Sequence, residues 1–142
     1  MKVCPTNALQ PVILQAGANG VWTPHVIPEI GYCEYSCTLC GSVCPTGAIK
    51  KLTAEEKKKT VIGVAEVNKG LCIAWAKNLE CLVCEEHCPV SQKAVKVIET
   101  IVEGIPVKRP YVDVDLCVGC GICQNKCPVR PERAIRVKGV PV

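Results

Sequence analysis

Closely spaced cysteines dominate this sequence. The chain has 142 residues and 13 of them are Cys, several times ordinary usage. Toward the C-terminal end, a C-x2-C-x2-C-x3-C-P run contains Cys117, Cys120, Cys123 and Cys127. Thiolates in a run of this spacing are typical ligands of a [4Fe–4S] cluster. The chemistry that these residues indicate is therefore iron–sulfur ligation with Cys sulfurs as the ligands.

Two further runs repeat the C-x2-C-x3-C-P ending. One contains Cys81, Cys84 and Cys88, with Cys72 displaced upstream by eight intervening residues. The other contains Cys37, Cys40 and Cys44, with Cys33 four positions ahead of the first of them. Because Cys33 and Cys72 depart from the regular spacing, each is either a ligand or a bystander. The repeats indicate several clusters in one chain.

An incomplete copy of the motif stands at the start. The ending Cys-Pro-Thr-x-Ala begins at Cys4 and occurs again at Cys44. The partner that a C-x3-C-P motif requires would lie one position before Met1. We therefore expect that the chain starts inside a motif, that Met1 is an internal Met, and that an upstream part supplies three more cysteines.

The ligand sets follow from a rule of two-cluster proteins of this type. The fourth Cys of one run ligates the cluster of the other run, which fastens the two halves together. The predicted sets are Cys117, Cys120 and Cys123 with Cys88; Cys72, Cys81 and Cys84 with Cys127; and Cys33, Cys37 and Cys40 with Cys4. Cys44 remains for a fourth cluster with ligands upstream of Met1. The chain is thus predicted to hold three complete [4Fe–4S] clusters.

Short strands and helices are expected to position these loops. Strands are predicted at Val61–Val67 and Ala134–Lys138, and a hairpin at Val95–Val102 and Ile105–Tyr111. Thr53 and Glu56 form a capping-box pattern that begins a helix through Lys59. Each fourth Cys is expected to begin a short helix. A turn is predicted around Gly17 and Asn19, and Pro24–Pro28 is interpreted as an extended, exposed segment.

Two glycines in the last run have a predicted role of their own. Gly119 and Gly121 permit positive φ and let backbone N–H groups approach the cluster sulfurs. The core is otherwise poor, since the chain has no Phe and one Met. Small domains with thin cores usually need metals or disulfides as staples. We place a boundary after the helix that ends at Lys59, which gives units 1–60 and 61–142.

The order of the motifs resembles that of the NapG/MauM family of ferredoxin-type proteins. A Cys-Pro-Thr-x-Ala-Leu ending comes first, then a loop ending Cys-Pro-Thr-Gly-Ala-Ile, then a displaced Cys with its run, then the regular run. The resemblance covers nearly the whole chain. It implies an α+β fold of tandem ferredoxin-like units, the first truncated and the second a complete two-cluster unit. The ligands it implies are Cys4, Cys33, Cys37, Cys40, Cys72, Cys81, Cys84, Cys88, Cys117, Cys120, Cys123 and Cys127, with Cys44 in the truncated site.

The resemblance also implies a role. Proteins of this family carry four [4Fe–4S] clusters and pass electrons from a quinol-oxidising membrane partner toward periplasmic redox enzymes, such as a terminal reductase. This implies the periplasmic face or the membrane as the location. The spacing from Cys33 to Cys37 departs from the family, and its twin-arginine export signal is not among the 142 residues. A cytoplasmic polyferredoxin subunit of a hydrogenase or reductase complex is the alternative.

Other classes of site fit the sequence less well. A structural zinc module, the remote alternative, would use two separated C-x2-C pairs rather than longer runs ending in Cys-Pro. A disulfide-rich domain fits poorly with an odd number of closely spaced Cys. His25 and His87 are the only histidines, and no phosphate loop, nucleotide fingerprint or nucleophile motif is present. We expect the chain to have no enzyme activity of its own, and any catalysis to belong to partner subunits.

The charge of the chain does not indicate nucleic-acid binding. The formal net charge of +4 counts every Cys as neutral. Each [4Fe–4S] core with four thiolates adds roughly −2, so three sites give a net charge of roughly −2. The lysine run Lys57–Lys59, which follows Glu55 and Glu56, is interpreted as a solvated helix face. No apolar stretch of about 18 residues, the length that spans a membrane, is present.

Overall fold

The chain folds into two compact units, residues 1–60 (unit 1) and residues 61–142 (unit 2). A computed structural model describes residues 2–13 and 20–140 of the chain. The turn predicted around Gly17 and Asn19, and Met1, lie outside the described residues. That each unit is a cluster-bearing ferredoxin-like unit stays a prediction.

Within residues 2–13 and 20–60, unit 1 consists of one strand pair and two short helices. Its elements are β1 (Leu9–Val12), β2 (Thr23–Val26), α1 (Leu39–Ser42) and α2 (Ala54–Lys59). β1 and β2 are antiparallel, and Pro11 lies opposite Pro24. Proline is tolerated there because both members of a two-stranded pair are edge strands. The Pro24–Pro28 segment is therefore partly a paired strand, which corrects the interpretation of it as merely extended and exposed.

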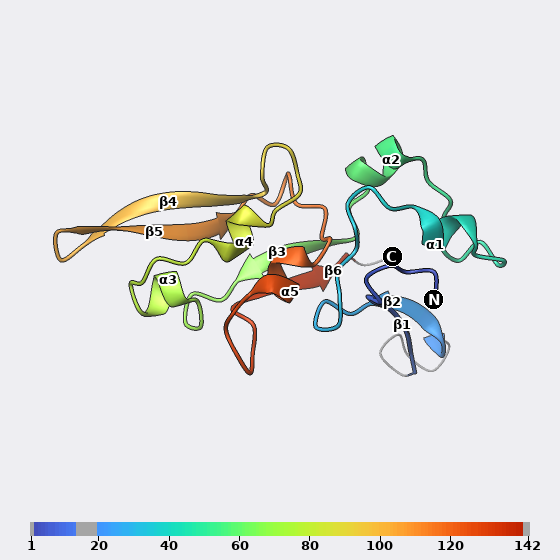
Figure 1. Cartoon of the computed structure of the whole chain (residues 1–142), viewed down its shortest axis with the longest axis horizontal. Coiled ribbons are helices and arrows are strands. Elements are labelled where there is room, and N and C mark those ends of the chain that lie inside the picture. The colour runs from blue at the N-terminus through green and yellow to red at the C-terminus, as the bar shows by residue number, and fades with distance from the viewer. Residues whose placement is uncertain (1, 14–19, 141–142) are drawn as a thin grey trace. The chain divides into compact units, whose positions relative to one another are not determined.

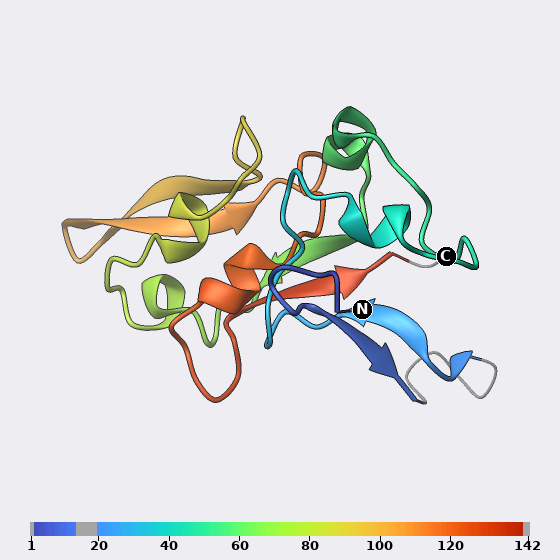
Figure 2. The same ribbon diagram turned by 45° about the vertical axis from the view of Figure 1, so that its right-hand side comes forward.

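Unit 2 consists of two antiparallel strand pairs and three short helices (Figure 1). Its elements are β3 (Gly63–Val67), α3 (Ile73–Ala76), α4 (Val83–Glu86), β4 (Val95–Val102), β5 (Ile105–Val112), α5 (Ile122–Lys126) and β6 (Ile135–Gly139). β4 and β5 form the predicted hairpin, which turns at Glu103 and Gly104 with φ of 51° and 81°. β3 pairs with β6, and α5 lies beside this pair (Figure 2). The mixture of short helices and strands confirms the α+β class.

The core of unit 2 is made of small side chains and sulfur. Alanines and cysteines make up most of the buried cluster, together with Val95 and Ile135. Ala65, Ala74, Ala94 and Ala134 are each at most 3% exposed. Small side chains bury little apolar area, so this core supplies little hydrophobic stabilisation for its length. They also leave room around the thiols, where a bound cluster would add stabilisation that the apolar side chains do not supply.

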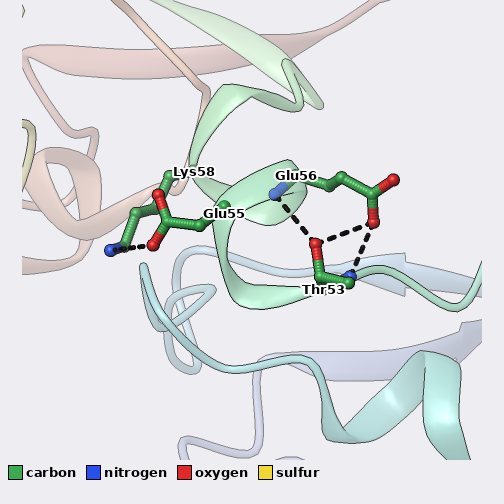
Figure 3. Close-up of polar contacts among 4 residues, drawn as sticks. All are labelled: Thr53, Glu55, Glu56 and Lys58. Atoms are coloured by element: carbon green, nitrogen blue, oxygen red, sulfur yellow. Dashed lines mark hydrogen bonds and ion pairs between the residues drawn. The ribbon is translucent and has the colours of Figure 1, made fainter.

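The predicted capping box is present at the start of α2 (Figure 3). Thr53 Oγ1 accepts a hydrogen bond from the Glu56 N–H at 3.3 Å, and Glu56 Oε2 accepts one from the Thr53 N–H at 2.8 Å. One turn on, Lys58 pairs with Glu55 at 2.9 Å. This reciprocal bonding satisfies two otherwise orphaned helix N–H groups and fixes where α2 begins.

Two predictions about helices are wrong. Each helix precedes the fourth Cys of its run instead of starting there: α5 ends at Lys126, and Cys127, which follows it, has φ −53° and ψ 127°. The proline after that Cys clashes with a helical conformation, so the helix stops. The lysine run is also not one solvated face, because Lys57 is only 7% exposed. Successive residues of a helix point about 100° apart, so three adjacent lysines cannot share one face.

Within residues 2–13 and 20–140, no helix has the length and apolar character needed to cross a membrane.

Candidate iron–sulfur sites

Four thiols from two separate runs line one cavity in unit 2. They belong to Cys88, Cys117, Cys120 and Cys123. The cavity holds about 320 Å³ of space free of protein atoms, including the part open to solvent. The other lining residues are largely small or apolar, among them Ala65, Ala94 and Val137. The structure thus brings together the four cysteines of the first predicted ligand set.

The backbone around this cavity is shaped by glycine. Gly119 and Gly121 have φ of 73° and 81°, as predicted from their place in the run. Gly121 is the residue immediately before α5, and the helix carries Cys123 toward the cavity. From the other side, the Ala65 N–H of β3 donates a hydrogen bond to Cys117 Sγ at 3.4 Å. Such N–H···S bonds stabilise a negatively charged sulfur.

A second cavity in unit 2 is lined by the other predicted set. Its thiols are those of Cys72, Cys81, Cys84 and Cys127. Cys72 immediately precedes α3 and is buried, and it lies with its set despite its irregular spacing in the sequence. Cys127 reaches this cavity from the end of α5, while the other cysteines of its run line the first cavity. Each run therefore supplies its fourth Cys to the cavity that is lined by the other run.

The environment of these thiols is unfavourable for an isolated negative charge. Burial, followed by the repulsion of Cys72 and Cys81, raises the pKa of Cys84 to about 12. Burial and the neighbouring Cys120 and Cys117 raise the pKa of the Cys123 thiol well above its usual range. Buried thiolates in such company need a cationic core to neutralise them. The residues present therefore fit an iron–sulfur core held by four sulfurs.

The thiols do not converge as the ligands of one metal ion would. In the described part of the chain, no group of three or more His, Cys, Asp or Glu side chains is arranged to hold a single ion. The four cysteines of each predicted set in unit 2 line one cavity. Four thiolates per set is the number of protein ligands of a [4Fe–4S] core, whose iron atoms each take one sulfur. All thirteen cysteines are described, and none forms a disulfide.

Two of the other predicted ligands of unit 1 act on the Cys33 thiol. Burial raises the pKa of the Cys33 thiol, Lys57 acts in the opposite direction, and Cys40 and Cys4 raise it further. Three of the four predicted ligands therefore lie close enough to act on one another electrostatically. Cys37 is half-buried in the turn where its N–H donates to the Glu34 carbonyl at 3.2 Å.

The two Cys-Pro-Thr endings share a local contact. The Thr6 hydroxyl lies 3.4 Å from Cys4 Sγ, and the Thr46 hydroxyl lies 3.6 Å from Cys44 Sγ. A hydrogen bond from the Ile49 N–H, followed by that of Thr46, lowers the pKa of Cys44 to about 7. At Cys4, burial works to raise the pKa, but hydrogen bonds from Thr6 and from backbone N–H groups lower it.

Two kinds of residue beside the predicted ligands were missed in the sequence. The threonine hydroxyls beside Cys4 and Cys44 carried a usable signal, because Thr follows Cys-Pro in both copies. Lys57 carried none, since it stands in a run of three lysines of which only one is buried.

Comparison with known proteins gives the site a family context. A family model described as a 4Fe-4S binding domain matches residues 110–131, which contain the regular Cys run. The methylamine utilization ferredoxin-type protein MauM of Methylophilus methylotrophus is 31% identical over 138 residues, covering 96% of this chain and 60% of the relative.

Relatives with other names are similar to the same extent. The ferredoxin-type protein NapG of Escherichia coli K12 is 30% identical, covering 96% of this chain and 60% of its own length. The ferredoxin-type protein NapF of the same strain is 30% identical, covering 87% of this chain and 66% of its own length. The chain thus spans about three fifths of the length of these MauM and NapG relatives.

Proposed function

We propose that this chain relays single electrons through several [4Fe–4S] clusters. The premise is that the chain is a ferredoxin-type electron-transfer protein with a 4Fe–4S binding domain. Its donor in this proposal is a quinol-oxidising membrane partner and its acceptor a terminal reductase. The number of clusters proposed for these 142 residues is three.

The observation that carries the proposal is the crossing of two Cys runs at two cavities. Each cavity is lined by three thiols of one run and the fourth thiol of the other. Cys84 of one set is near enough to affect the Cys123 thiol of the other set electrostatically. Neighbouring redox centres of this kind favour electron transfer between them without movement of the protein.

The chain's own residues have three tasks in this relay. A bound [4Fe–4S] cluster supplies the chemistry, which is the reversible uptake of one electron. The thiolates of the two sets hold the iron, and the Ala65 N–H donates to Cys117 Sγ, which favours the more negative state. Apolar side chains make up most of the remaining lining of both cavities, which lowers the local polarity around the sulfurs.

The proposed partners rest on family likeness. The names of the relatives tie MauM to methylamine utilization and describe NapG and NapF as ferredoxin-type proteins. None of these names states a donor or an acceptor. The membrane donor and the reductase therefore remain part of the proposal for this chain.

A test of the relay uses anaerobically loaded protein. Dithionite reduction followed by reoxidation with a one-electron acceptor should return about three electron equivalents per chain. The protein, mixed with native membranes and a quinol, should be reduced only when the membranes are present. Protein that takes up no electrons reversibly would contradict the relay. Reduction by a soluble donor but not by quinol and membranes would contradict the proposal of a quinol-oxidising membrane partner.

A further inference from the structure

Two arginine side chains converge on the backbone of one predicted cluster ligand. Nη1 of Arg130 and Nη1 of Arg133 each donate a hydrogen bond to the Cys127 carbonyl oxygen, whose two lone pairs can accept both. Nη1 of Arg130 also donates to the Val129 carbonyl oxygen at 2.9 Å. Because Cys127 and Val129 line the second cavity, both guanidinium groups lie beside that cavity.

These two positive charges have no carboxylate partner among the residues that the structure describes. None of the ion pairs within residues 2–13 and 20–140 includes Arg130 or Arg133. Glu132, which stands between them in the sequence, pairs with Arg136 at 2.5 Å. Two like charges held on one oxygen atom repel each other, and Arg133 is half-buried. The arrangement therefore favours a negative group nearby that compensates both charges.

The cations beside the first cavity are paired differently. Lys93 and Lys96 flank two of its lining residues in the sequence. Lys93 pairs with Glu85 and Lys96 with Asp113, each at 2.6 Å. Their charges are thus offset by carboxylates of the chain, whereas the two arginines bring uncompensated positive charge to the second cavity.

A cluster in the second cavity would supply the compensating negative charge. A [4Fe–4S] core with four thiolates carries roughly −2, and one added electron makes it roughly −3. The carbonyl oxygen and the sulfur of one Cys are only a few bonds apart, well within the Debye length of about 10 Å at 0.1 M salt. A cation at that oxygen therefore stabilises the more negative, reduced state by more than the oxidised state.

We propose that the guanidinium groups of Arg130 and Arg133, held on the Cys127 carbonyl, raise the reduction potential of the cluster in the second cavity. This inference rests on the proposed function, because it requires a cluster at that cavity. The two arginines act through their charge and make this cluster easier to reduce than its cysteine ligands alone would. The electron comes from the donor protein, and no covalent bond to either arginine forms or breaks.

The experiment compares double variants of the chain with the wild type. Arg130→Gln with Arg133→Gln (the Gln pair) removes both charges and keeps polar donors, and Arg130→Lys with Arg133→Lys (the Lys pair) keeps both charges. The readouts are iron and acid-labile sulfide per chain and a redox titration followed by electron paramagnetic resonance. Cys81→Ser, which replaces one sulfur of the second cavity by oxygen, marks the signal of the cluster held there.

The matched control is Arg136→Gln with Lys138→Gln. It also removes two positive charges, but in the wild type these charges pair with Glu132 and Glu66. Side chains alternate along a strand, and both residues lie at exposed positions of β6, next to Val137, which lines the first cavity. The control therefore changes the net charge equally from a face that points away from the cavities.

We expect the Gln pair to keep its iron and sulfide and to lower the potential of the second cluster. The equilibrium constant for one-electron reduction of that cluster should fall about tenfold, which corresponds to about 59 mV. The Lys pair and the control should leave that potential near the wild-type value. Should the Gln pair fail to load, Arg133→Gln alone replaces it, because Arg133 is the more buried of the two, and its shift should have the same direction.

Three results would overturn the inference. One is a second-cluster potential in the Gln pair, or in its replacement Arg133→Gln, that equals the wild-type value. Another is an equal drop in the control, since the effect would then be one of net charge alone. The third is loss of the second cluster in both the Gln pair and Arg133→Gln, which would give the arginines a role in assembly instead. Wild-type protein without iron and sulfide would contradict the proposed function itself, and that result is known before any variant is compared.

Discussion

The backbone of Gly119 lies directly against the backbone of Gly63. A Cβ placed on Gly119 would stand 2.3 Å from the Gly63 carbonyl oxygen. Gly119 also has φ of 73°, a conformation that residues with a Cβ rarely adopt. This contact seats the loop that carries Cys117 and Cys120 on the first strand of unit 2. The closeness of the two backbones is thus a condition for the geometry of the first cavity.

Gly119→Ala is expected to damage the first cluster site. At Gly104 the φ is also positive, 81°, but no atom lies within 4 Å of an added Cβ. Gly104→Ala should therefore cost only the conformational penalty, about 1–2 kcal/mol, and keep its iron. Gly119→Ala should cost more and lose iron, because the clash is with backbone. Thermal unfolding and iron content per chain measure both effects, and equal behaviour of the two variants would contradict the account.

Cys120→Ala tests the crossing of the two runs. The variant should lose about four iron and four sulfide per chain, and it should unfold at lower temperature because Cys88 no longer ties its run to the first cavity. Cys44→Ala is the matched control, since its predicted site is incomplete in this chain. It should keep the wild-type metal content. A Cys120→Ala protein with full iron and wild-type stability would show that the ligand pairing is wrong.

The cysteine spacing predicted much of unit 2. The sets predicted from sequence line the two cavities, and the hairpin around Gly104 has the predicted strands. These features are local or follow from a repeated motif, so the sequence carries them. The pairing of β3 with β6 joins residues about 70 positions apart along the chain. Both strands were predicted, but nothing in the sequence of either strand indicates which other strand it pairs with.

The features that were missed depend on tertiary placement. Lys57 looks like its neighbours in the sequence, and only the packing of α2 decides that it is buried. The strand pair of unit 1 was missed because Pro11 and Pro24 lower the strand propensity of both segments. The motif predicted a helix that begins at each fourth Cys, but the proline after Cys127 disfavours a helical conformation of that Cys, so the helix lies before it.

Trp75→Phe is expected to destabilise unit 2. The Trp75 indole Nε1–H donates to the carbonyl of the buried Pro110 at 2.9 Å, and its ring contacts the Lys69 and Arg109 cations at 4.3 and 4.9 Å. Losing the hydrogen bond should cost about 1 kcal/mol. Trp22, which is 67% exposed, provides the control. Thermal unfolding should show a drop for Trp75→Phe and none for Trp22→Phe, and equal shifts would rule out the role given to Trp75.

Thr53→Ala is expected to raise the pKa of Glu56. Hydrogen bonds from the N–H and the hydroxyl of Thr53 hold the pKa of that carboxyl below its usual range. The carboxylate therefore stabilises the fold above the pKa of the unfolded chain, and this contribution is lost as pH falls through the depressed value. The variant loses the hydroxyl but keeps the backbone N–H of residue 53, so an NMR titration should move the Glu56 pKa part of the way toward the ordinary value. The pKa of Glu55, which Lys58 lowers, should stay unchanged. An unmoved Glu56 would contradict the capping geometry.

The most direct test of the central claim is iron and acid-labile sulfide per chain, with a visible spectrum, on anaerobically purified or reconstituted protein. The account predicts about twelve of each, and a broad brown absorption that bleaches on reduction with dithionite. About eight of each would show that one predicted ligand set, that of Cys4 and Cys33 in unit 1, holds no cluster. Zinc without sulfide would contradict the electron-transfer account altogether.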